Sequence, residues 1–355
     1  MTSNQNATSG AASGVAPSEP APIKIAVMGA GSWGTTFAKV LADDSNNEIV
    51  LWARREDVVE EINEEHRNGD YLPGIKLPAN LKASTDAAEV LAGASQVYLS
   101  VPSQTLRDNL KTWGPSIPAG AIIVSLMKGV EKDTGLRMSE VIAEVTGFDA
   151  SQIVVISGPN LAPEIAKQEP TASVAASASK ASALAVAKAS SNSYFTTFTN
   201  RDVIGTEFGG ILKNLIAVAI GIVNGVGYGE NTKASIMTRG LAEISRFAVA
   251  YGAKPNTMVG LAGMGDLIAT SESPLSRNHR AGEMLGKGFT KREVLKRMQQ
   301  TAEGLSSVAP ILQLAEAKGV SMPIVEQVLL VMEGKMAPKD IAPFLTHSTD
   351  TPLDE

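Results

Sequence analysis

The chain has 355 residues, of which 44% are apolar and 19% are charged, with a formal net charge of −6 and no cysteine. This length exceeds what one ordinary hydrophobic core holds, so we expect two globular domains. The negative charge argues against nucleic-acid binding, and the lack of cysteine excludes disulfides and thiolate metal sites. The three histidines, His66, His279 and His347, are scattered, so no metal centre is expected.

The first 21 residues, MTSNQNATSGAASGVAPSEPA, are small and polar, and no basic segment is followed by an apolar stretch. They do not have the pattern of a secretory signal, and we expect a disordered lead over 1–21. The apolar run at 215–223 is far shorter than the roughly 20 residues that a membrane-spanning helix requires. The sequence therefore predicts a cytoplasmic protein with no membrane span.

From Ile23 onward, short apolar runs alternate with helical patterns. The runs IKIAVMG, EIVLWA, QVYLSV, AIIVSL and QIVVIS are typical of strands buried on both faces of a mostly parallel, doubly wound sheet. Two later runs, TASVAA and YFTTFT, could extend this sheet, and the alanine-rich SKASALAVAKASSN between them predicts a packed crossover helix. We therefore expect an α/β, Rossmann-like dinucleotide-binding domain over 22–203.

Beyond about Asn200, long helical patterns replace the strands. Examples are EFGGILKNLIAVAIGIVNGV, TKASIMTRGLAEISRFAVAYGA and TKREVLKRMQQ. They predict an all-helical substrate domain over 204–347, followed by a loose tail over 348–355. We expect the site where the two domains meet, because ligand sites favour domain interfaces and the carboxyl ends of parallel strands.

The glycine-rich stretch GAGSWG, residues 29–34, directly follows the first predicted strand and precedes the helical pattern TTFAKVLADD. In a dinucleotide-binding turn, the first glycine (Gly29) permits the tight turn and the second (Gly31) lets a pyrophosphate approach the backbone. The third (Gly34) allows the helix to pack closely on the strand. A turn that binds nothing is the alternative, but the motif lies in the setting that dinucleotide binding requires.

Two arginines follow the second predicted strand, at the place where an acidic residue would hold the ribose 2′-hydroxyl of NAD. Arg54 and Arg55 cannot accept that hydrogen bond but can pair with a 2′-phosphate. They favour NADP or at least tolerate it. Alternatively, both arginines are solvated and Glu56 reaches back to the ribose.

Two lysines follow apolar or glycine-rich stretches. Lys128, in IIVSLMKGVE, comes just past the carboxyl end of a predicted buried strand, where it could touch a substrate oxygen or simply be solvated. Lys213 leads an apolar helical run, so its stem should be buried while its ammonium faces a cavity or extends to solvent. Asn214 beside it, on another helix face, favours the cavity. A desolvated lysine suits proton transfer in carbonyl reduction.

Two further segments place polar groups at the end of apolar stretches. In VGLAGMGDLIAT, Asp266 and Thr270 lie one helical turn apart and could orient a lysine or bind a substrate hydroxyl, although a helix cap is the alternative. In SPLSRNHRAG, residues Ser276, Arg277 and Asn278 cluster at a predicted helix start, which suits a phosphate. A solvated basic loop is the alternative for this second segment.

Taken in order, many motifs resemble those of bacterial-type NAD(P)-dependent glycerol-3-phosphate dehydrogenases over about 23–335. They are GAGSWGTTFA, LWARR, YLPGIKLP, VPSQTLR, SLMKGVE, SGPNLAPEIA, GGILKNLIAVAIGI, NTKASIMTRGLAEI, LAGMGDL, LSRNHRAG and AEG. The resemblance implies reversible hydride transfer between NAD(P)H and C2 of dihydroxyacetone phosphate, a homodimer and a role in glycerophospholipid synthesis. A β-hydroxy acid dehydrogenase of the same layout and a non-catalytic dinucleotide sensor stay open as alternatives.

The resemblance also assigns roles to single residues. Lys213 would donate and accept the proton, and Asp266 with Asn214 would order Lys213 and the substrate hydroxyls. Family members usually read SGPSFA or SGPTFA where this chain has SGPNLA, so Asn160 would replace a hydroxyl contact with an amide contact. The residues expected at the substrate are Lys128, Gly158, Asn160, Lys213, Asn214, Asp266, Thr270, Ser276, Arg277 and Asn278, the last three of these at its phosphate.

A second set is expected to line the dinucleotide. It includes the glycine turn, the two arginines after the second strand, and positions from both predicted domains. Lys128 and Arg277 would touch substrate and cofactor alike. The set is Gly29, Gly31, Ser32, Trp33, Gly34, Arg54, Arg55, Lys128, Ala162, Arg277, Thr301 and Glu303.

Overall fold

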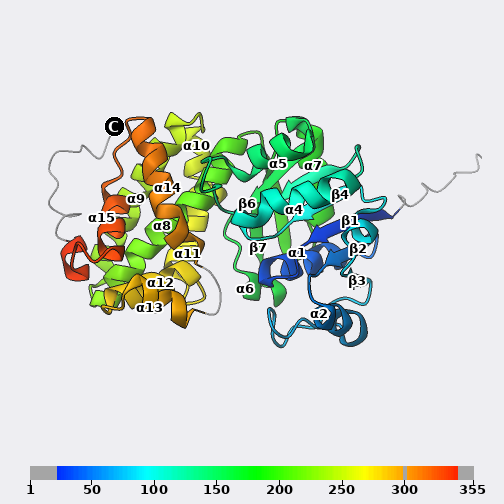
Figure 1. Cartoon of the computed structure of the whole chain (residues 1–355), viewed down its shortest axis with the longest axis horizontal. Helices are drawn as coiled ribbons and strands as arrows, with labels where there is room; N and C mark the ends of the chain where they lie inside the picture. Colours follow the sequence, from blue (N-terminus) through cyan, green and yellow to red (C-terminus); the bar gives the residue numbers. More distant parts are fainter. Residues whose placement is uncertain (1–21, 299–301, 343–355) are drawn as a thin grey trace, which may run out of the picture.

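The computed structural model describes residues 22–298 and 302–342. They form an α/β part built on one sheet and a helical part beside it, on the right and the left of Figure 1. Outside the described residues lie the predicted lead (1–21), Thr301 and residues 343–355, which include the predicted tail.

The α/β part contains an eight-stranded sheet with the strand order β3-β2-β1-β4-β5-β6-β7-β8. The strands from β1 to β6 pair in parallel, β7 is antiparallel to β6, and β8 is parallel to β7. The predicted mostly parallel, doubly wound sheet is confirmed. The strands are β1 Ile23–Met28, β2 Asn47–Trp52, β3 Leu81–Ser84, β4 Gln96–Leu99, β5 Ile122–Ser125, β6 Ile153–Ser157, β7 Thr171–Ala176 and β8 Phe195–Asn200.

Helices cover both faces of this sheet, because successive side chains of a strand point to opposite faces. In β1, Ile25 and Val27 pack with Phe37, while Ala26 packs with Leu110 on the other face. The first core is shared by α1 (Ser32–Ala42), α6 (Ala162–Ala166) and α7 (Lys180–Ser190). The second is shared by α3 (Ala87–Leu91), α4 (Leu106–Trp113) and α5 (Met138–Thr146), and α2 (Glu56–Glu60) follows β2.

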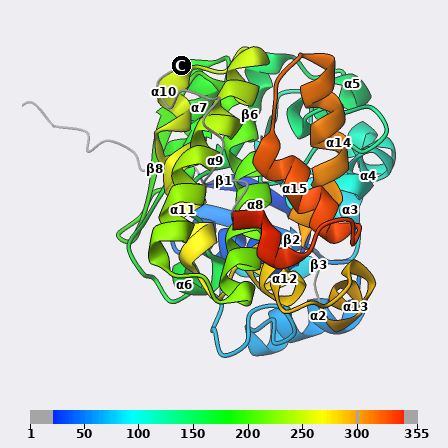
Figure 2. The ribbon, with the colours of Figure 1, turned by 90° about the vertical axis from the view of Figure 1, so that its left-hand side faces the viewer.

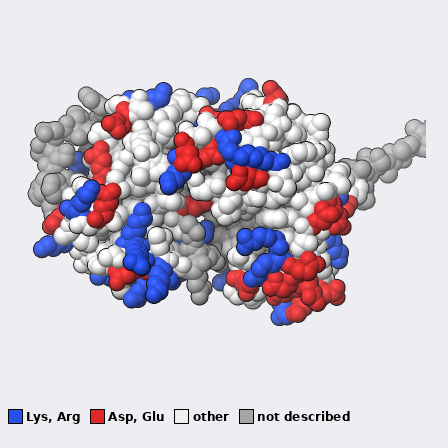
Figure 3. All heavy atoms as spheres, in the orientation of Figure 1, with Lys and Arg blue, Asp and Glu red and all other residues white. Residues whose placement is uncertain are grey.

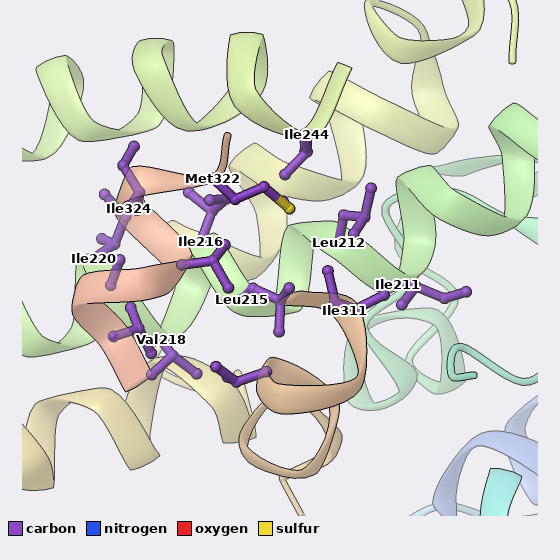
Figure 4. Close-up of a cluster of buried hydrophobic side chains, with 14 of the residues drawn as sticks. Ile211, Leu212, Leu215, Ile216, Val218, Ile220, Ile244, Ile311, Met322 and Ile324 are labelled. Atoms are coloured by element: carbon purple, nitrogen blue, oxygen red, sulfur yellow. The ribbon is translucent and has the colours of Figure 1, made fainter. Parts of the chain in front are cut away.

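The helical part is organised around α8 (Val203–Val226), which runs through its middle (Figure 2). Side chains of α8 such as Leu212 and Ile216 pack against Ile244, Ile311 and their neighbours (Figure 4). Each such fully buried side chain contributes about 1.5–3 kcal/mol. The surrounding helices are α9 Glu230–Ala250, α10 Pro255–Met258, α11 Asp266–Glu272, α12 Arg277–Gly286, α13 Lys291–Arg297, α14 Glu303–Ala317 and α15 Pro323–Met332.

The length and composition of α8 would allow it to cross a membrane, with a mean hydropathy of 1.6 in its most apolar window. However, 83% of that window is buried inside the protein. A central core helix is apolar all round for the same physical reason as a membrane span, since both lack contact with water. The hydropathy of α8 is therefore explained by its packing.

Charges of both signs mix on the face shown in Figure 3, where acidic residues gather at the lower right. The segment of α2 and the π-helical turn η1 (Glu61–Glu65) contributes exposed carboxylates at Glu60, Glu64 and Glu65. On this face there is no broad basic area of the kind that binds a nucleic-acid backbone.

Candidate active site

The glycine-rich turn between β1 and α1 uses its three glycines for three different reasons. Gly29 has a φ of +127°, and a Cβ there would lie 2.3 Å from the carbonyl oxygen of Ser100. A Cβ on Gly34 would lie 1.9 Å from the carbonyl oxygen of Gly29, so any side chain is excluded from that position. At Gly31, by contrast, no heavy atom lies within 4 Å of the Cβ position. The turn is thus closed on two sides and open at Gly31.

The first turn of α1 lies at this opening. Its N-cap residue, Gly31, has no side chain to cap the helix, so the first backbone N–H groups have no side-chain cap. Trp33 Nε1 donates a hydrogen bond to the carbonyl oxygen of Leu126 at 3.2 Å, which ties α1 to the segment after β5. Thr36 Oγ1 donates to the carbonyl oxygen of Ala162 at 3.4 Å, which brings the start of α6 onto α1.

The two arginines after β2 differ in their surroundings. Arg55 forms ion pairs with Asp57 and Asp70, and the hydrogen bond to Asp70 is the main cause that raises its pKa. Arg54 is exposed and forms no ion pair within the described part of the chain. The Glu56 carboxylate accepts a hydrogen bond from Thr85 Oγ1 at 3.1 Å. Of the two arginines, Arg54 is thus the one that has no ion pair among the described residues.

At the carboxyl edge of the sheet, two lysines share one carboxylate. Lys213 Nζ, on α8, lies 2.8 Å from Asp266 Oδ1 and also contacts Thr270 Oγ1. Lys128 Nζ, just after β5, lies 2.6 Å from Asp266 Oδ2 and 3.1 Å from the carbonyl oxygen of Gly158. Asp266 and Thr270 occupy one flank of α11, four residues apart. The structure thus brings together five of the predicted site residues from four segments.

The burial of Lys213 follows from the two glycines that precede it. A Cβ on Gly210 would lie 2.5 Å from Ser157 Oγ at the end of β6, and one on Gly209 would lie 2.4 Å from the carbonyl oxygen of Ala262. Without these side chains, α8 passes close to the sheet edge and to the turn before α11. Lys213 therefore enters a closed environment and is only 6% exposed.

The electrostatics of this cluster shift two pKa values. Burial lowers the pKa of Lys213 to about 8, the charge of Asp266 opposes that shift, and the charge of Lys128 adds to it. Burial also raises the pKa of Glu303, at the start of α14, against the attraction of Arg277 and the two lysines. An ammonium with a pKa of about 8 can give and take a proton near neutral pH.

The predicted phosphate residues lie at the N-terminus of α12. Ser276 is the N-cap, and its Oγ accepts a hydrogen bond from the backbone N–H of His279 at 3.2 Å. Asn278 Oδ1 accepts one from the backbone N–H of Gly304 at 2.9 Å, which joins α12 to α14. Both side chains act as acceptors here, so their hydrogens stay available to an anion. Arg277 is exposed at this helix end.

Two amides predicted at the substrate have contrasting contacts. Asn160 Oδ1 accepts a hydrogen bond from Ser173 Oγ at 3.1 Å, while its buried Nδ2 has no partner within the described residues. A buried unpaired donor of this kind fits a ligand or water. Asn214 is buried too, but its Nδ2 donates to the carbonyl oxygen of Gly210 at 3.4 Å rather than contacting Lys213. A contact of Asn214 with substrate stays a prediction.

A pocket of about 400 Å³ lies on another flank of α11 and α12. None of the residues predicted to bind substrate or cofactor lines it, so it is separate from the lysine cluster. Its lining residues are Asn224, Lys233, Ser271, Glu272, Pro274, His279, Arg280 and Glu283.

Family sequence profiles match most of the chain. Residues 24–183 match the N-terminal region, and residues 202–343 the C-terminal region, of NAD-dependent glycerol-3-phosphate dehydrogenase. The chain belongs to the NAD-dependent glycerol-3-phosphate dehydrogenase family. The resemblance inferred from the ordered motifs is confirmed.

Individual members of this family are similar over nearly their whole length. A protein of Leifsonia xyli subsp. xyli named glycerol-3-phosphate dehydrogenase [NAD(P)+] is 62% identical over 93% of this chain and 89% of its own. A protein of the same name from Thermobifida fusca is 51% identical over 92% of this chain and 97% of its own. The crystal structure of the Coxiella burnetii glycerol-3-phosphate dehydrogenase superposes with a TM-score of 0.87 at 35% identity, covering 92% of this chain and all of that one.

One group of residues near the site escaped the sequence analysis. Arg137, Ser139 and Glu207 form a largely buried polar contact between the start of α5 and α8, the helix that also carries Lys213. The partners are about 70 residues apart in sequence. The sequence signal that could have revealed the contact is Glu207 itself, a glutamate near the start of a predicted apolar helix.

Proposed function

We propose that this chain is an NAD(P)-dependent sn-glycerol-3-phosphate dehydrogenase that reversibly reduces dihydroxyacetone phosphate, with Lys213 as general acid and base. The buried cluster of Lys213, Asp266 and Lys128 at the carboxyl edge of the sheet is the observation that supports it most. Membership of the family and the names of the relatives support the same reaction.

The residues around the glycine turn fit a dinucleotide. Gly31 leaves open space next to a helix N-terminus, where pyrophosphate binds in Rossmann folds. Ser32, Trp33 and Ala162 border this opening, and Glu303 would approach from α14. A bound nicotinamide cofactor would supply the hydride that reaches C2 of the substrate.

Lys213 would protonate the oxygen at C2 as that oxygen gains negative charge. Below pH 8 its ammonium is present, and Asp266 and Thr270 hold the nitrogen in one position. Lys128 brings a second positive charge to the same place and would support the developing charge. A positioned acid of this kind contributes about 10²- to 10⁴-fold to the rate.

The charges of the cluster favour an anionic substrate. Lys128, Lys213 and Arg277 bring three positive charges, and Asp266 and Glu303 bring two negative ones, so one positive charge is in excess. The N-terminus of α12 adds the positive end of a helix dipole. A phosphate held there would position C2 without taking part in the chemistry.

The pH dependence should follow the pKa of Lys213, which burial lowers to about 8. Reduction needs the protonated form, so kcat/KM for dihydroxyacetone phosphate should be level below pH 8 and fall about tenfold per pH unit above it. Oxidation needs the neutral form, so kcat/KM for sn-glycerol 3-phosphate should rise up to pH 8 and then level off. Initial rates in both directions between pH 6 and about 10 test this. Parallel profiles in the two directions would exclude Lys213 as the titrating group.

The substitution Arg277→Ala should weaken binding of the phosphorylated substrate about 100-fold, since charge-assisted hydrogen bonds contribute about 1.5–3 kcal/mol each. Activity with non-phosphorylated dihydroxyacetone should change little. Steady-state kinetics with both ketones give the comparison. An equal loss of kcat/KM with the two substrates would show that Arg277 does not bind the phosphate.

We extend the proposal to NADPH, because Arg54 is exposed after β2 and, unlike Arg55, has no ion pair among the described residues. The substitution Arg54→Gln should raise the KM for NADPH about tenfold and leave the KM for NADH unchanged. Arg55→Gln serves as the matched control, because Arg55 is already paired with Asp57 and Asp70. Equal KM changes for the two cofactors in Arg54→Gln would count against 2′-phosphate recognition.

One assay tests the proposed function directly. NADH and NADPH oxidation is measured with purified protein, each with and without dihydroxyacetone phosphate. Oxidation that needs a β-keto acid instead would favour a β-hydroxy acid dehydrogenase, and cofactor binding without any turnover would favour a dinucleotide sensor. The proposal also includes a homodimer and a role in glycerophospholipid synthesis, both on the strength of the family resemblance. A cytoplasmic location is proposed from the sequence pattern.

A further inference from the structure

A buried glutamate joins the two parts of the molecule a short distance from the lysine cluster. Glu207 lies on α8, six residues before Lys213, and is 3% exposed. Its carboxylate accepts hydrogen bonds from the backbone N–H of Ser139 at 2.9 Å and from Ser139 Oγ at 2.5 Å. It also accepts one from Arg137 Nη1 at 2.5 Å. We call Arg137, Ser139 and Glu207 the interdomain clasp.

The clasp reaches α5, a helix that packs on the sheet. Arg137 is the N-cap residue of α5, and Ser139 belongs to its first turn, where backbone N–H groups have no partner inside the helix. Glu207 therefore satisfies one free N–H of α5 from the helical part of the molecule. Its negative charge lies at the positive end of the α5 dipole, where it is favourable.

The clasp is also connected to Lys128. Arg137 pairs with Val130 in an isolated antiparallel bridge, and Val130 lies two residues after Lys128. Through Arg137, Glu207 thus contacts the segment that carries Lys128. Glu207 itself lies on α8, the helix that carries Lys213. Asp266 pairs with both lysines. One of them comes from the segment after β5 and the other from α8, the two segments that the clasp joins.

We propose that Glu207 is a positioning residue, which fixes α8 against the Lys128 segment so that Lys128 and Lys213 meet at Asp266. This inference rests on the proposed function of the cluster. Apolar surfaces packed face to face can slide by a fraction of an ångström at small cost, whereas three hydrogen bonds to one carboxylate define a single register.

A buried charge is a costly way to obtain stability alone. Burial raises the pKa of Glu207 against the attraction of Arg137, so ionising this carboxyl group costs the hydration that it would have in water. Apolar side chains of similar volume often stabilise such a site as well as an ion pair does. The position near two functional lysines gives the clasp a purpose beyond stability.

The test compares Glu207→Ala with Glu243→Ala. Glu243 is a buried glutamate on α9 that also binds a helix start, where it accepts hydrogen bonds from the backbone N–H groups of Ile324 and Val325 at 3.0 and 3.1 Å. It lies within the helical part and does not join it to the sheet. The measurements are kcat for dihydroxyacetone phosphate, KM for NAD(P)H, and amide hydrogen exchange over residues 130–139.

We expect Glu207→Ala to lower kcat about 10- to 100-fold, as misplaced catalytic groups do. KM for NAD(P)H should change much less than kcat, because the glycine turn lies wholly within the α/β part, and exchange at Ser139 should accelerate. Glu243→Ala should lose stability but keep kcat. Faster exchange with wild-type kcat in a folded Glu207→Ala protein would overturn the positioning role, as would an equal fall of kcat in Glu243→Ala.

A milder variant keeps the test decisive if Glu207→Ala does not fold. Glu207→Gln keeps the side-chain volume and an acceptor for the Ser139 N–H but loses the ion pair with Arg137. It should lower kcat several-fold with a smaller change in KM for NAD(P)H, and an unchanged kcat in this folded variant would refute the inference. If the wild-type protein does not turn over dihydroxyacetone phosphate, the proposed function is refuted. Hydrogen exchange over residues 130–139 would still report on the clasp, so the two failures can be told apart.

Discussion

Replacing Lys213 by alanine is expected to abolish turnover while leaving NAD(P)H binding intact. The substitution removes the buried ammonium, whose nitrogen lies 2.8 Å from Asp266 and whose pKa burial lowers to about 8, and with it the proposed proton donor. General acid catalysis of this kind supplies about 10²- to 10⁴-fold, so the remaining rate should be below about a hundredth of that of the wild type. Steady-state kinetics give the rate, and fluorescence titration with NADH gives the cofactor affinity.

A matched control separates chemistry from folding. Lys39, on α1, is also a buried lysine, 5% exposed and paired with Asp43 at 2.7 Å, but it lies apart from the cluster. Lys39→Ala should be destabilised and still turn over at the wild-type rate. If Lys213→Ala keeps more than about a tenth of the wild-type rate, Lys213 is not the proton donor.

The substitution Asp266→Asn should damage both activity and stability. The charge of Asp266 raises the pKa of Lys213 against the effects of burial and Lys128, so its removal should move that pKa below 8. Less of the ammonium form is then present at neutral pH, and the fall of the reduction rate should begin at a lower pH. The buried Lys213 and the half-buried Lys128 also lose their shared partner, which should cost about 3 kcal/mol in the free energy of unfolding.

The control for this variant is Asp202→Asn. Asp202 is 5% exposed and accepts hydrogen bonds from the backbone N–H groups of Gly205 and Lys254, both at 2.8 Å, at the start of α8. It should lose stability in urea unfolding without any shift in the pH profile of reduction. A profile that moves equally in both variants, or in neither, would contradict the proposed coupling of Asp266 to Lys213.

The sheet could be predicted from sequence in outline because its strands are buried on both faces and read as apolar runs. β3 was missed: it has only four residues at the sheet edge, and its side chains alternate between buried and more exposed. The reversed direction of β7 and β8 was not predicted either, because an apolar run is the same in both directions. Strand direction is set by the connections, which in a single sequence leave no local pattern.

The residues of the lysine cluster could be predicted from the sequence, but the way in which they contact one another could not. Lys213 and Asp266 each stood out in their own segment as a charged residue beside an apolar run. The family resemblance then assigned both residues to one site. That one carboxylate serves both lysines depends on the crossing of α8 and α11, which no short motif encodes. The clasp at Glu207 was missed because its partners are about 70 residues away and polar residues near a helix start are common.

The uninterrupted course of α8 limits how this enzyme can be recombined with its relatives. The helix begins beside the sheet, passes the end of β6 at Gly210, and continues as the centre of the helical part. A chimaera joined at residue 202, where the second of the two matched regions begins, would separate the first turns of α8 from the strand on which they pack. Functional hybrids should therefore exchange β6 together with the opening half of α8, so that the modular boundary falls inside a helix rather than in a loop.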